Sequence, residues 1–290
     1  MTSGTSVFVT APDGLKLHAR EYGPRTARLP VVCLPGLART AEDFEPLAGA
    51  LARHRRVLAL DYRGRGLSQY DRNAANYSLP VELADVLAVQ VARAAMPAVF
   101  VGTSRGGILV MLLAAQRPSA IAGAILNDIG PVIEPAGLIR IKGYVGKLPR
   151  PRSFEEGAEI LRRLFGNQFP RLAPQDWLAG ARRMWREDKG RLVPTYDPKL
   201  AKALADITPE TPLPPLWNQF DALARVPLMV VRGANSDILS AQTAAAMAAR
   251  RQAIDLIEVP DQGHTPLLCE SEIIERIAAF VEACDKTARH

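Results

Sequence analysis

The chain has few cysteines and histidines and no long apolar run. Of its 290 residues, three are cysteine and four are histidine. Cys33, Cys269 and Cys284 are widely spaced without a C-x-x-C pair, so they predict neither a disulfide framework nor a metal site, and we interpret Cys33 and Cys269 as small buried apolar residues. No segment approaches the ~18 to 20 consecutive apolar residues that cross a bilayer, and residues 1–10 lack the regions of a signal peptide. We therefore expect a cytoplasmic protein that spans no membrane.

Charge of one sign is not concentrated either. The formal net charge is +6, but arginines occur in every region instead of forming one basic stripe. This distribution indicates a solvated surface and disfavours a nucleic-acid interface. The hydrophobic fraction of 48% over this length suits one large α/β domain with an insertion. We expect no nucleic-acid partner and no membrane partner, and the oligomeric state is left open.

Short apolar runs alternate with helical patterns along most of the chain. Residues 5–10 and 15–21 alternate in polarity and predict an antiparallel hairpin. The apolar runs at residues 30–34 and 57–60 predict strands buried on both faces, and further strands are predicted at residues 98–101, 123–127, 227–231 and 254–259. Helical spacing predicts helices at residues 41–52, from 80 onward, and at 105–116, 241–250 and 272–283. The predicted fold is a doubly wound, mostly parallel α/β sheet that binds ligands at the carboxyl ends of its strands.

The alternation stops between residues 132 and 217. This part is rich in proline and has helical patterns at residues 154–165 and 174–186, but no strand-like apolar run of comparable strength. We interpret residues 132–217 as an inserted helical cap, or lid, on a core formed by residues 1–131 and 218–290. We expect about two of its aromatic rings to face a substrate. The aromatic residues concentrated here are Tyr144, Phe165, Phe169, Trp177, Trp185, Tyr196 and Trp217.

One serine lies where a predicted strand meets a predicted helix. The sequence GTSRG at residues 102–106 has the spacing G-x-S-x-G, which is typical of a nucleophile elbow. Glycines two positions either side of Ser104 remove Cβ atoms where the strand and the helix crowd each other. Ser104 is therefore the predicted nucleophile, and the alternative is a serine that caps the helix.

A base and an acid are expected in loops that follow later strands. A serine hydroxyl needs a base within hydrogen-bond reach, and an imidazole can accept and return its proton. His264 follows a predicted strand and a glycine, so it is the predicted base. Asp237, in the loop after the next-to-last predicted strand, is predicted to orient this imidazole. Asp128, which directly follows another predicted strand, is the alternative acid, whereas Asp261 is too close to His264 in sequence.

Two backbone donors are expected to hold the oxyanion that develops on a substrate carbonyl. One is the N–H of Arg105, the residue after the predicted nucleophile. The other is the N–H of Leu37, in the loop PGLA at residues 35–38. The Arg105 guanidinium needs a carboxylate partner, for which Asp128 is the candidate, and recruitment of anionic substrates is the less favoured role of its charge.

Five motifs in this order resemble the α/β-hydrolase superfamily. They are LPG at residues 34–36, DYRGRGLS at 61–68, the elbow, the acid loop and the histidine loop, and they cover most of the chain. The second of them also has a structural interpretation, as a tight turn in which Asp61 and Arg63 satisfy backbone groups and neighbouring charges. The resemblance is to the lidded esterase and C–C-hydrolase branch, which implies a helical cap between the sixth and seventh core strands and chemistry without a cofactor.

Two positions depart from that branch. Members commonly have His-Gly where this chain has Pro35 and Gly36, so a side chain that often braces the oxyanion loop is absent. Thr265 follows the predicted base where C–C hydrolases of this group typically have tryptophan, which disfavours that activity.

The resulting prediction is a capped serine hydrolase that cleaves a small-molecule carboxylic ester or lactone through an acyl-enzyme. A C–C bond hydrolase or a haloperoxidase-like enzyme would use the same triad, and a small-molecule receptor with slow turnover is the alternative of another class. Epoxide hydrolases and haloalkane dehalogenases are excluded because they need a carboxylate where Ser104 stands. The acyl and alcohol groups of the substrate are left open.

Overall fold

The structure is a computed structural model that describes residues 4–208, 213–251 and 253–287. Its main sheet is built from the strands β1 (Thr5–Thr10), β2 (Lys16–Tyr22), β3 (Val31–Leu34), β4 (Val57–Asp61), β5 (Ala98–Thr103), β6 (Ile121–Asn127), β9 (Leu228–Gly233) and β10 (Ile254–Val259). Within the described residues these form an eight-stranded sheet in the order β1-β2-β4-β3-β5-β6-β9-β10. β2 pairs antiparallel with β1 and β4, and the other neighbours are parallel. The predicted mostly parallel α/β sheet is confirmed.

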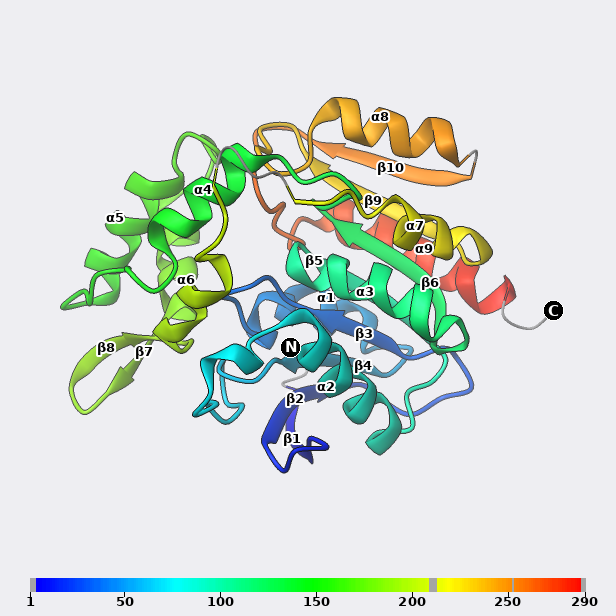
Figure 1. Cartoon of the computed structure of the whole chain (residues 1–290), viewed down its shortest axis with the longest axis horizontal. Coiled ribbons are helices and arrows are strands. Elements are labelled where there is room, and N and C mark those ends of the chain that lie inside the picture. Colours follow the sequence, from blue (N-terminus) through cyan, green and yellow to red (C-terminus); the bar gives the residue numbers. More distant parts are fainter. Residues whose placement is uncertain (1–3, 209–212, 252, 288–290) are drawn as a thin grey trace.

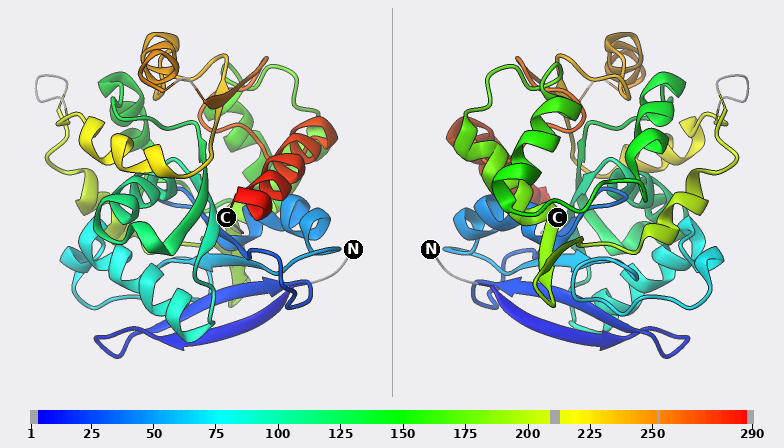
Figure 2. Two further views of the ribbon diagram at one scale, coloured as in Figure 1. Left: turned by 90° about the vertical axis from the view of Figure 1, so that its right-hand side faces the viewer. Right: turned by 90° about the vertical axis from the view of Figure 1, so that its left-hand side faces the viewer.

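Helices cover both faces of this sheet (Figures 1 and 2). The core helices are α1 (Glu45–Leu51), α2 (Leu79–Ala92), α3 (Arg105–Gln116), α7 (Trp217–Asp221), α8 (Ala241–Arg250) and α9 (Ser271–Thr287). Short 3₁₀ turns are η1 (Ala41–Phe44), η2 (Ala74–Asn76), η3 (Pro118–Ala120) and η5 (Ala222–Arg225). Side chains of β3 alternate between two apolar clusters: Val31 and Cys33 pack with α1 and α9, whereas Val32 and Leu34 pack with α2 and α3. This alternation explains why the central strands are apolar along their whole length.

Residues 132–217, called the inserted segment from here on, connect β6 to β9. They form α4 (Pro135–Tyr144), α5 (Phe154–Phe165), α6 (Pro174–Met184), β7 (Trp185–Asp188), β8 (Arg191–Pro194) and η4 (Pro198–Leu204). Figure 1 shows these elements together on one side of the core, past the ends of the strands and not over the faces of the sheet. None of the helices in the described ranges is both long and apolar enough for a membrane crossing.

The β7–β8 hairpin departs from the sequence prediction, which placed a helix up to residue 186 and no strand here. α6 ends at Met184, and Trp185 begins the hairpin with a fully buried side chain. The other residues of β7 are charged and exposed, so they lack the apolar alternation that marks a strand. Lys189 and Gly190 have φ values of 50° and 73°, as a two-residue hairpin turn requires, and this turn pair was the available signal.

Candidate active site

Ser104 occupies the sharp turn between β5 and α3. Its φ is 51° and its ψ is −114°, a strained backbone conformation for a residue other than glycine. A Cβ on Gly102 would lie 2.6 Å from the backbone N of Gly107, and a Cβ on Gly106 would lie 2.1 Å from the carbonyl oxygen of Leu34. The predicted crowding of strand and helix is therefore present, and it explains why glycines flank the serine.

A hydrogen-bonded chain links this serine to an imidazole and a buried carboxylate. Ser104 Oγ lies 2.8 Å from His264 Nε2. His264 Nδ1 lies 2.7 Å from Asp128 Oδ2, and the Asp128 side chain has no exposed surface. Oδ2 of Asp128 also accepts from Ser236 Oγ at 2.6 Å, and its Oδ1 accepts from the backbone N–H of Gly233 at 2.8 Å. The structure thus brings Ser104 and His264 together as expected, with Asp128 behind the imidazole.

The predicted contact between Asp237 and His264 is wrong, and Asp128 takes that place. Both oxygens of Asp237 accept from Arg140 of α4, at 2.5 Å from Nε and 2.7 Å from Nη2. Burial raises the pKa of Asp237, but the hydrogen bond and the charge of Arg140 outweigh it, so the pKa lies below its ordinary value. α4 packs closely over this loop, because a Cβ on Gly137 would lie 2.4 Å from the Asp237 carbonyl oxygen. An inserted helix has therefore captured the carboxylate that the sequence assigned to the triad.

The loop after β3 lies directly against the nucleophile. A Cβ on Gly36 would lie 3.9 Å from the Ser104 Cβ. The backbone N–H of Leu37 has no hydrogen-bond acceptor within the described part of the chain. Arg105 is the first residue of α3, so its N–H precedes the helical ladder. These positions suit the predicted oxyanion donors, whose role stays a prediction.

Two side chains brace this loop in place of the absent histidine. Tyr62 Oη donates to the Pro35 carbonyl at 3.2 Å, and Arg65 Nε donates to the Leu37 carbonyl at 2.8 Å. Both are fully buried. The sequence analysis did not single out either residue for this task, although both lie in the DYRGRGLS run.

Arg65 and Arg105 share the carboxylate of Glu82, which lies on α2. Arg65 Nη1 is 2.7 Å from Glu82 Oε1, and Arg105 Nε is 2.5 Å from Oε2. The prediction that Asp128 pairs with Arg105 is therefore wrong. Burial raises the pKa of Glu82, but the charges of the two arginines outweigh this effect and lower it below its ordinary value. The charge inside the elbow is thus paired within the core, where one carboxylate serves two arginines.

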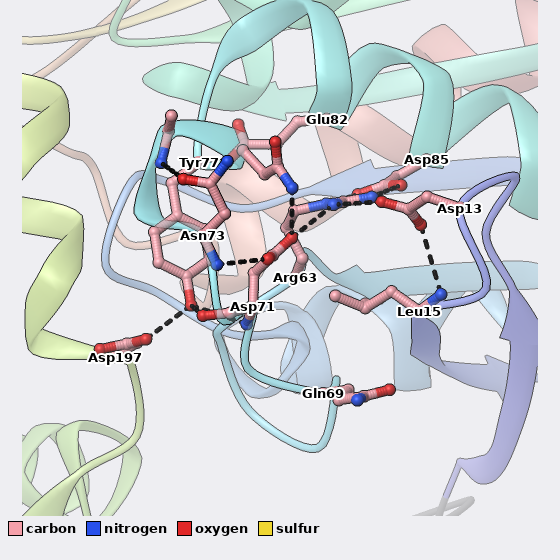
Figure 3. A network of polar contacts seen from close by, with 12 residues as sticks. Asp13, Leu15, Arg63, Gln69, Asp71, Asn73, Tyr77, Glu82, Asp85 and Asp197 are labelled. Carbon is pink, nitrogen blue, oxygen red and sulfur yellow. Dashed lines mark hydrogen bonds and ion pairs between the residues drawn. The ribbon is translucent and has the colours of Figure 1, made fainter.

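Arg63 is held by three carboxylates, as Figure 3 shows. Its Nε and Nη2 donate to Asp85 at 2.7 and 2.6 Å, and its Nη1 donates to Asp13 and Asp71, each at 2.8 Å. Asp61 accepts from the backbone N–H groups of Ala41 and Leu67 at 2.7 and 3.0 Å. The structural interpretation of Asp61 and Arg63 is confirmed.

The same turn ties the inserted segment to the core. Tyr77 Oη donates to Asp197 Oδ2 at 2.6 Å (Figure 3). The backbone N–H of Asp197 donates to the Gly64 carbonyl at 2.8 Å, and that of Gly66 donates to the Thr195 carbonyl at 2.7 Å. The C-terminal part of the inserted segment is therefore fixed beside the residues that brace the Leu37 loop.

A cavity of about 180 Å³ opens over Ser104 and His264, between the strand-end loops and the inserted segment. Four aromatic residues of the inserted segment line it, namely Tyr144, Phe165, Phe169 and Trp177, where about two were expected, and Phe44 of the core lines it as well. Trp185 and Tyr196 are buried elsewhere, and Trp217 packs edge-on against Phe220. Cys269 is exposed and lines the cavity, so its predicted burial is wrong, whereas Cys33 is buried. No group of three or more His, Cys, Asp or Glu side chains suited to a metal ion is found among the described residues.

Comparisons with known proteins agree on one family. A model of the alpha/beta hydrolase family matches residues 31–280. A relative from Cupriavidus necator, named 3-hydroxybutyrate-oligomer hydrolase, is 36% identical over 265 residues, which cover 88% of this chain and 89% of the relative. The 2-(acetamidomethylene)succinate hydrolase of Mesorhizobium japonicum is 24% identical and covers 93% and 92% of the two chains. A crystal structure of an alpha/beta hydrolase from Novosphingobium aromaticivorans, 42% identical, superposes with a TM-score of 0.91 over 97% of this chain and 99% of that chain.

Proposed function

Because this chain belongs to the alpha/beta hydrolase family, we propose that it is a serine hydrolase that cleaves a small-molecule carboxylic ester through an acyl-enzyme on Ser104. The observation that carries the proposal is the hydrogen-bonded chain from Ser104 through His264 to the buried Asp128, at the wall of a cavity. A nucleophile, a base and an acid in this relation are the arrangement that activates a serine for acyl transfer.

The first half-reaction forms the acyl-enzyme. Ser104 Oγ attacks the ester carbonyl carbon while His264 Nε2 takes the hydroxyl proton. The oxyanion accepts from the backbone N–H groups of Leu37 and Arg105. The tetrahedral intermediate collapses, the carbon–oxygen bond to the alcohol breaks, and the alcohol leaves with the proton from His264. Asp128 accepts from His264 Nδ1 throughout and stabilises the imidazolium.

The second half-reaction releases the acid. Water gives a proton to His264 Nε2 as its oxygen attacks the acyl carbon, and the bond to Ser104 Oγ then breaks. The proton returns to Ser104, which restores the resting enzyme. In this proposal the inserted segment is the cap, because residues of α4, α5 and α6 supply the cavity wall that faces the serine.

The comparisons favour an ester as the bond cleaved. The Cupriavidus necator relative is named for oligomers of 3-hydroxybutyrate, whose units are joined by carboxylic ester bonds. Linear esters of hydroxy acids are accordingly the first substrates to test on this chain, and lactones are the second.

A fluorophosphonate probe and a series of 4-nitrophenyl esters of increasing acyl length test the proposal. We expect a single adduct on Ser104, located by mass spectrometry, and turnover that Ser104→Ala abolishes. Asp128→Asn should lower kcat about 10³- to 10⁴-fold, because the imidazolium loses its orienting charge. The matched control, Asp237→Asn, should lower kcat less than about tenfold, because Asp237 contacts Arg140 and not the imidazole.

Three results contradict the proposal. An adduct elsewhere removes Ser104 as nucleophile. Labelling of Ser104 with negligible turnover across the series identifies a receptor with a hydrolase fold. An Asp237→Asn defect as large as that of Asp128→Asn returns the acid role to Asp237.

A further inference from the structure

Arg183 places at the active-site cavity a guanidinium that makes no hydrogen bond within the described residues. It lies near the C-terminal end of α6 and lines the cavity together with Ser104 and His264. Its Nε has no exposed surface and no hydrogen-bond partner, and Asp43 Oδ1 lies 3.5 Å away, beyond a good hydrogen bond. No hydrogen bond from this guanidinium to any residue that the structure describes is found. Since a guanidinium carries five N–H donors, this side chain can donate two hydrogen bonds to one anionic group.

Asp43 cannot satisfy Arg183, because it is already paired. Arg39 donates to both of its oxygens, at 2.6 Å from Nε and 2.7 Å from Nη2. Arg39 and Asp43 balance each other's charge, and Arg183 meets Asp43 only as an ion pair at 3.5 Å without a hydrogen bond. Asp176 also lines the cavity, but its Oδ2 accepts from the Ala173 N–H at 2.9 Å. It lies seven positions before Arg183 in α6, which is about 10 Å along the helix axis.

Arg39, Asp43 and Arg183 form a charged cluster at the cavity. Its position relative to Ser104 suits an anionic group of the substrate. A Cβ on Gly36 would lie 3.3 Å from Arg39 Cγ and 3.9 Å from the Ser104 Cβ. The cluster therefore lies on the same side of the cavity as the Leu37 loop. Most other residues of the cavity wall are apolar, so Arg183 is one of the few charged side chains that line it.

We propose that Arg183 binds a free carboxylate of the substrate, and that the enzyme therefore prefers esters whose acyl or alcohol part carries a carboxylate. This inference rests on the proposed ester hydrolysis and names the substrate class for it. The carboxylate accepts two hydrogen bonds from the guanidinium, while the ester carbonyl lies at Ser104. Arg105 does not take this role, because its guanidinium pairs with Glu82 and Arg105 is not among the residues that line the cavity.

Two substrates that differ in one charge test the proposal. Mono-4-nitrophenyl glutarate carries a free carboxylate, and its methyl ester has the same chain without the charge. Wild type should have the higher kcat/KM for the glutarate. Arg183→Gln should lower kcat/KM for the anionic ester by about 10- to 100-fold, mainly by raising KM. It should change kcat/KM for the neutral ester by less than about twofold.

Two further variants separate charge from structure. Arg183→Lys keeps the charge but loses the planar fork, so it should recover part of the preference. Arg182→Gln is the matched control, because Arg182 is the neighbouring arginine of α6 and lies over the Phe154 ring at 5.1 Å. It should leave the ratio of the two kcat/KM values unchanged.

A binding measurement distinguishes failure of this inference from failure of the proposed function. Glutarate itself should bind wild type in calorimetry, and Arg183→Gln should weaken that binding about tenfold or more. If wild type hydrolyses neither ester but still binds glutarate through Arg183, the proposed function fails and the carboxylate site stands. If Arg183→Gln lowers kcat/KM equally for both esters, or leaves the ratio of the two kcat/KM values and the binding of glutarate unchanged, Arg183 does not recognise a carboxylate.

Discussion

Glu82 and Asp43 each lie between two arginines, and the two clusters differ in whether they line the cavity. Glu82 lies in the core, has no exposed surface, and pairs at 2.7 and 2.5 Å with Arg65 and Arg105. Arg65 also donates to the Leu37 carbonyl, so this side chain binds both a carboxylate and a backbone group of the protein. This buried cluster joins the loop after β3 to the first residue of α3.

The second cluster faces the cavity. Asp43 accepts twice from Arg39, and its side chain is 25% exposed, as against 0% for Glu82. Arg183 lies 3.5 Å away without a hydrogen bond. The same residue types therefore serve two purposes: the buried cluster fixes backbone groups away from the cavity, whereas the cluster that lines the cavity, with a guanidinium that makes no hydrogen bond, is suited to a ligand.

The largest expected difference between the clusters is in stability. Glu82→Gln leaves two buried cations without their counter-charge and should lower the free energy of unfolding by about 3 to 5 kcal/mol. Asp43→Asn should cost less than about 1 kcal/mol, because water reaches that cluster. Urea unfolding at pH 7 measures both values, and equal losses for the two variants would contradict the distinction.

Activity should separate the clusters next. Arg65→Met removes the donor to the Leu37 carbonyl and should lower kcat about tenfold with KM within about twofold, because the oxyanion loop is less well positioned. Tyr62→Phe, which removes the weaker brace on Pro35, should lower kcat only about two- to threefold. A loss in KM alone would show that Arg65 does not act through the oxyanion loop.

Acid should weaken the buried cluster. The pKa of Glu82 is lower in the folded protein than the ordinary 4.5, so its contribution to stability is complete above the unfolded pKa and is lost as pH falls through the folded value. On going from pH 7 to about pH 3.5, wild type should lose on the order of 1 kcal/mol more than Glu82→Gln. Parallel losses in the two proteins, measured by urea unfolding at both pH values, would show that Glu82 makes no such contribution.

The smallest expected effect concerns the charge inside the elbow. Arg105→Met should leave the ratio of kcat/KM for mono-4-nitrophenyl glutarate and its methyl ester within about twofold of wild type, because Glu82 already pairs with that guanidinium. A fall in the ratio as large as that for Arg183→Gln would transfer the recruitment of anions to Arg105.

Local patterns in the sequence predicted the sheet and most of the site. The apolar runs of β5 and β10 and the helical spacing of α3 and α8 depend on burial within each element, so periodicity alone indicated them. Ser104 was identified for a similar reason, because the G-x-S-x-G spacing lies within one strand–turn–helix unit, although the residue that crowds Gly106 is Leu34 of β3. His264 needed only its position after a strand.

The choice of acid required the tertiary structure. Asp128 follows β6 and Asp237 lies in the loop after β9, and these strands are parallel neighbours, so each carboxylate was a plausible partner for His264. The deciding contacts come from elsewhere in the chain: Ser236 and Gly233 hold Asp128, and Arg140 of α4 binds Asp237. α4 itself had no strong periodic signal in the sequence.

The sequence by itself determined the α/β sheet, the proposed nucleophile and base, and the place of the insertion, because each of these depends on neighbours a few residues apart. The tertiary structure alone decided which carboxylate lies behind His264, which one pairs with Arg105, and which arginine at the cavity makes no hydrogen bond. Arg105 meets Glu82, 23 residues away, and His264 meets Asp128, 136 residues away. A charged side chain reaches whatever opposite charge the fold brings to it, and no local pattern encodes that distance.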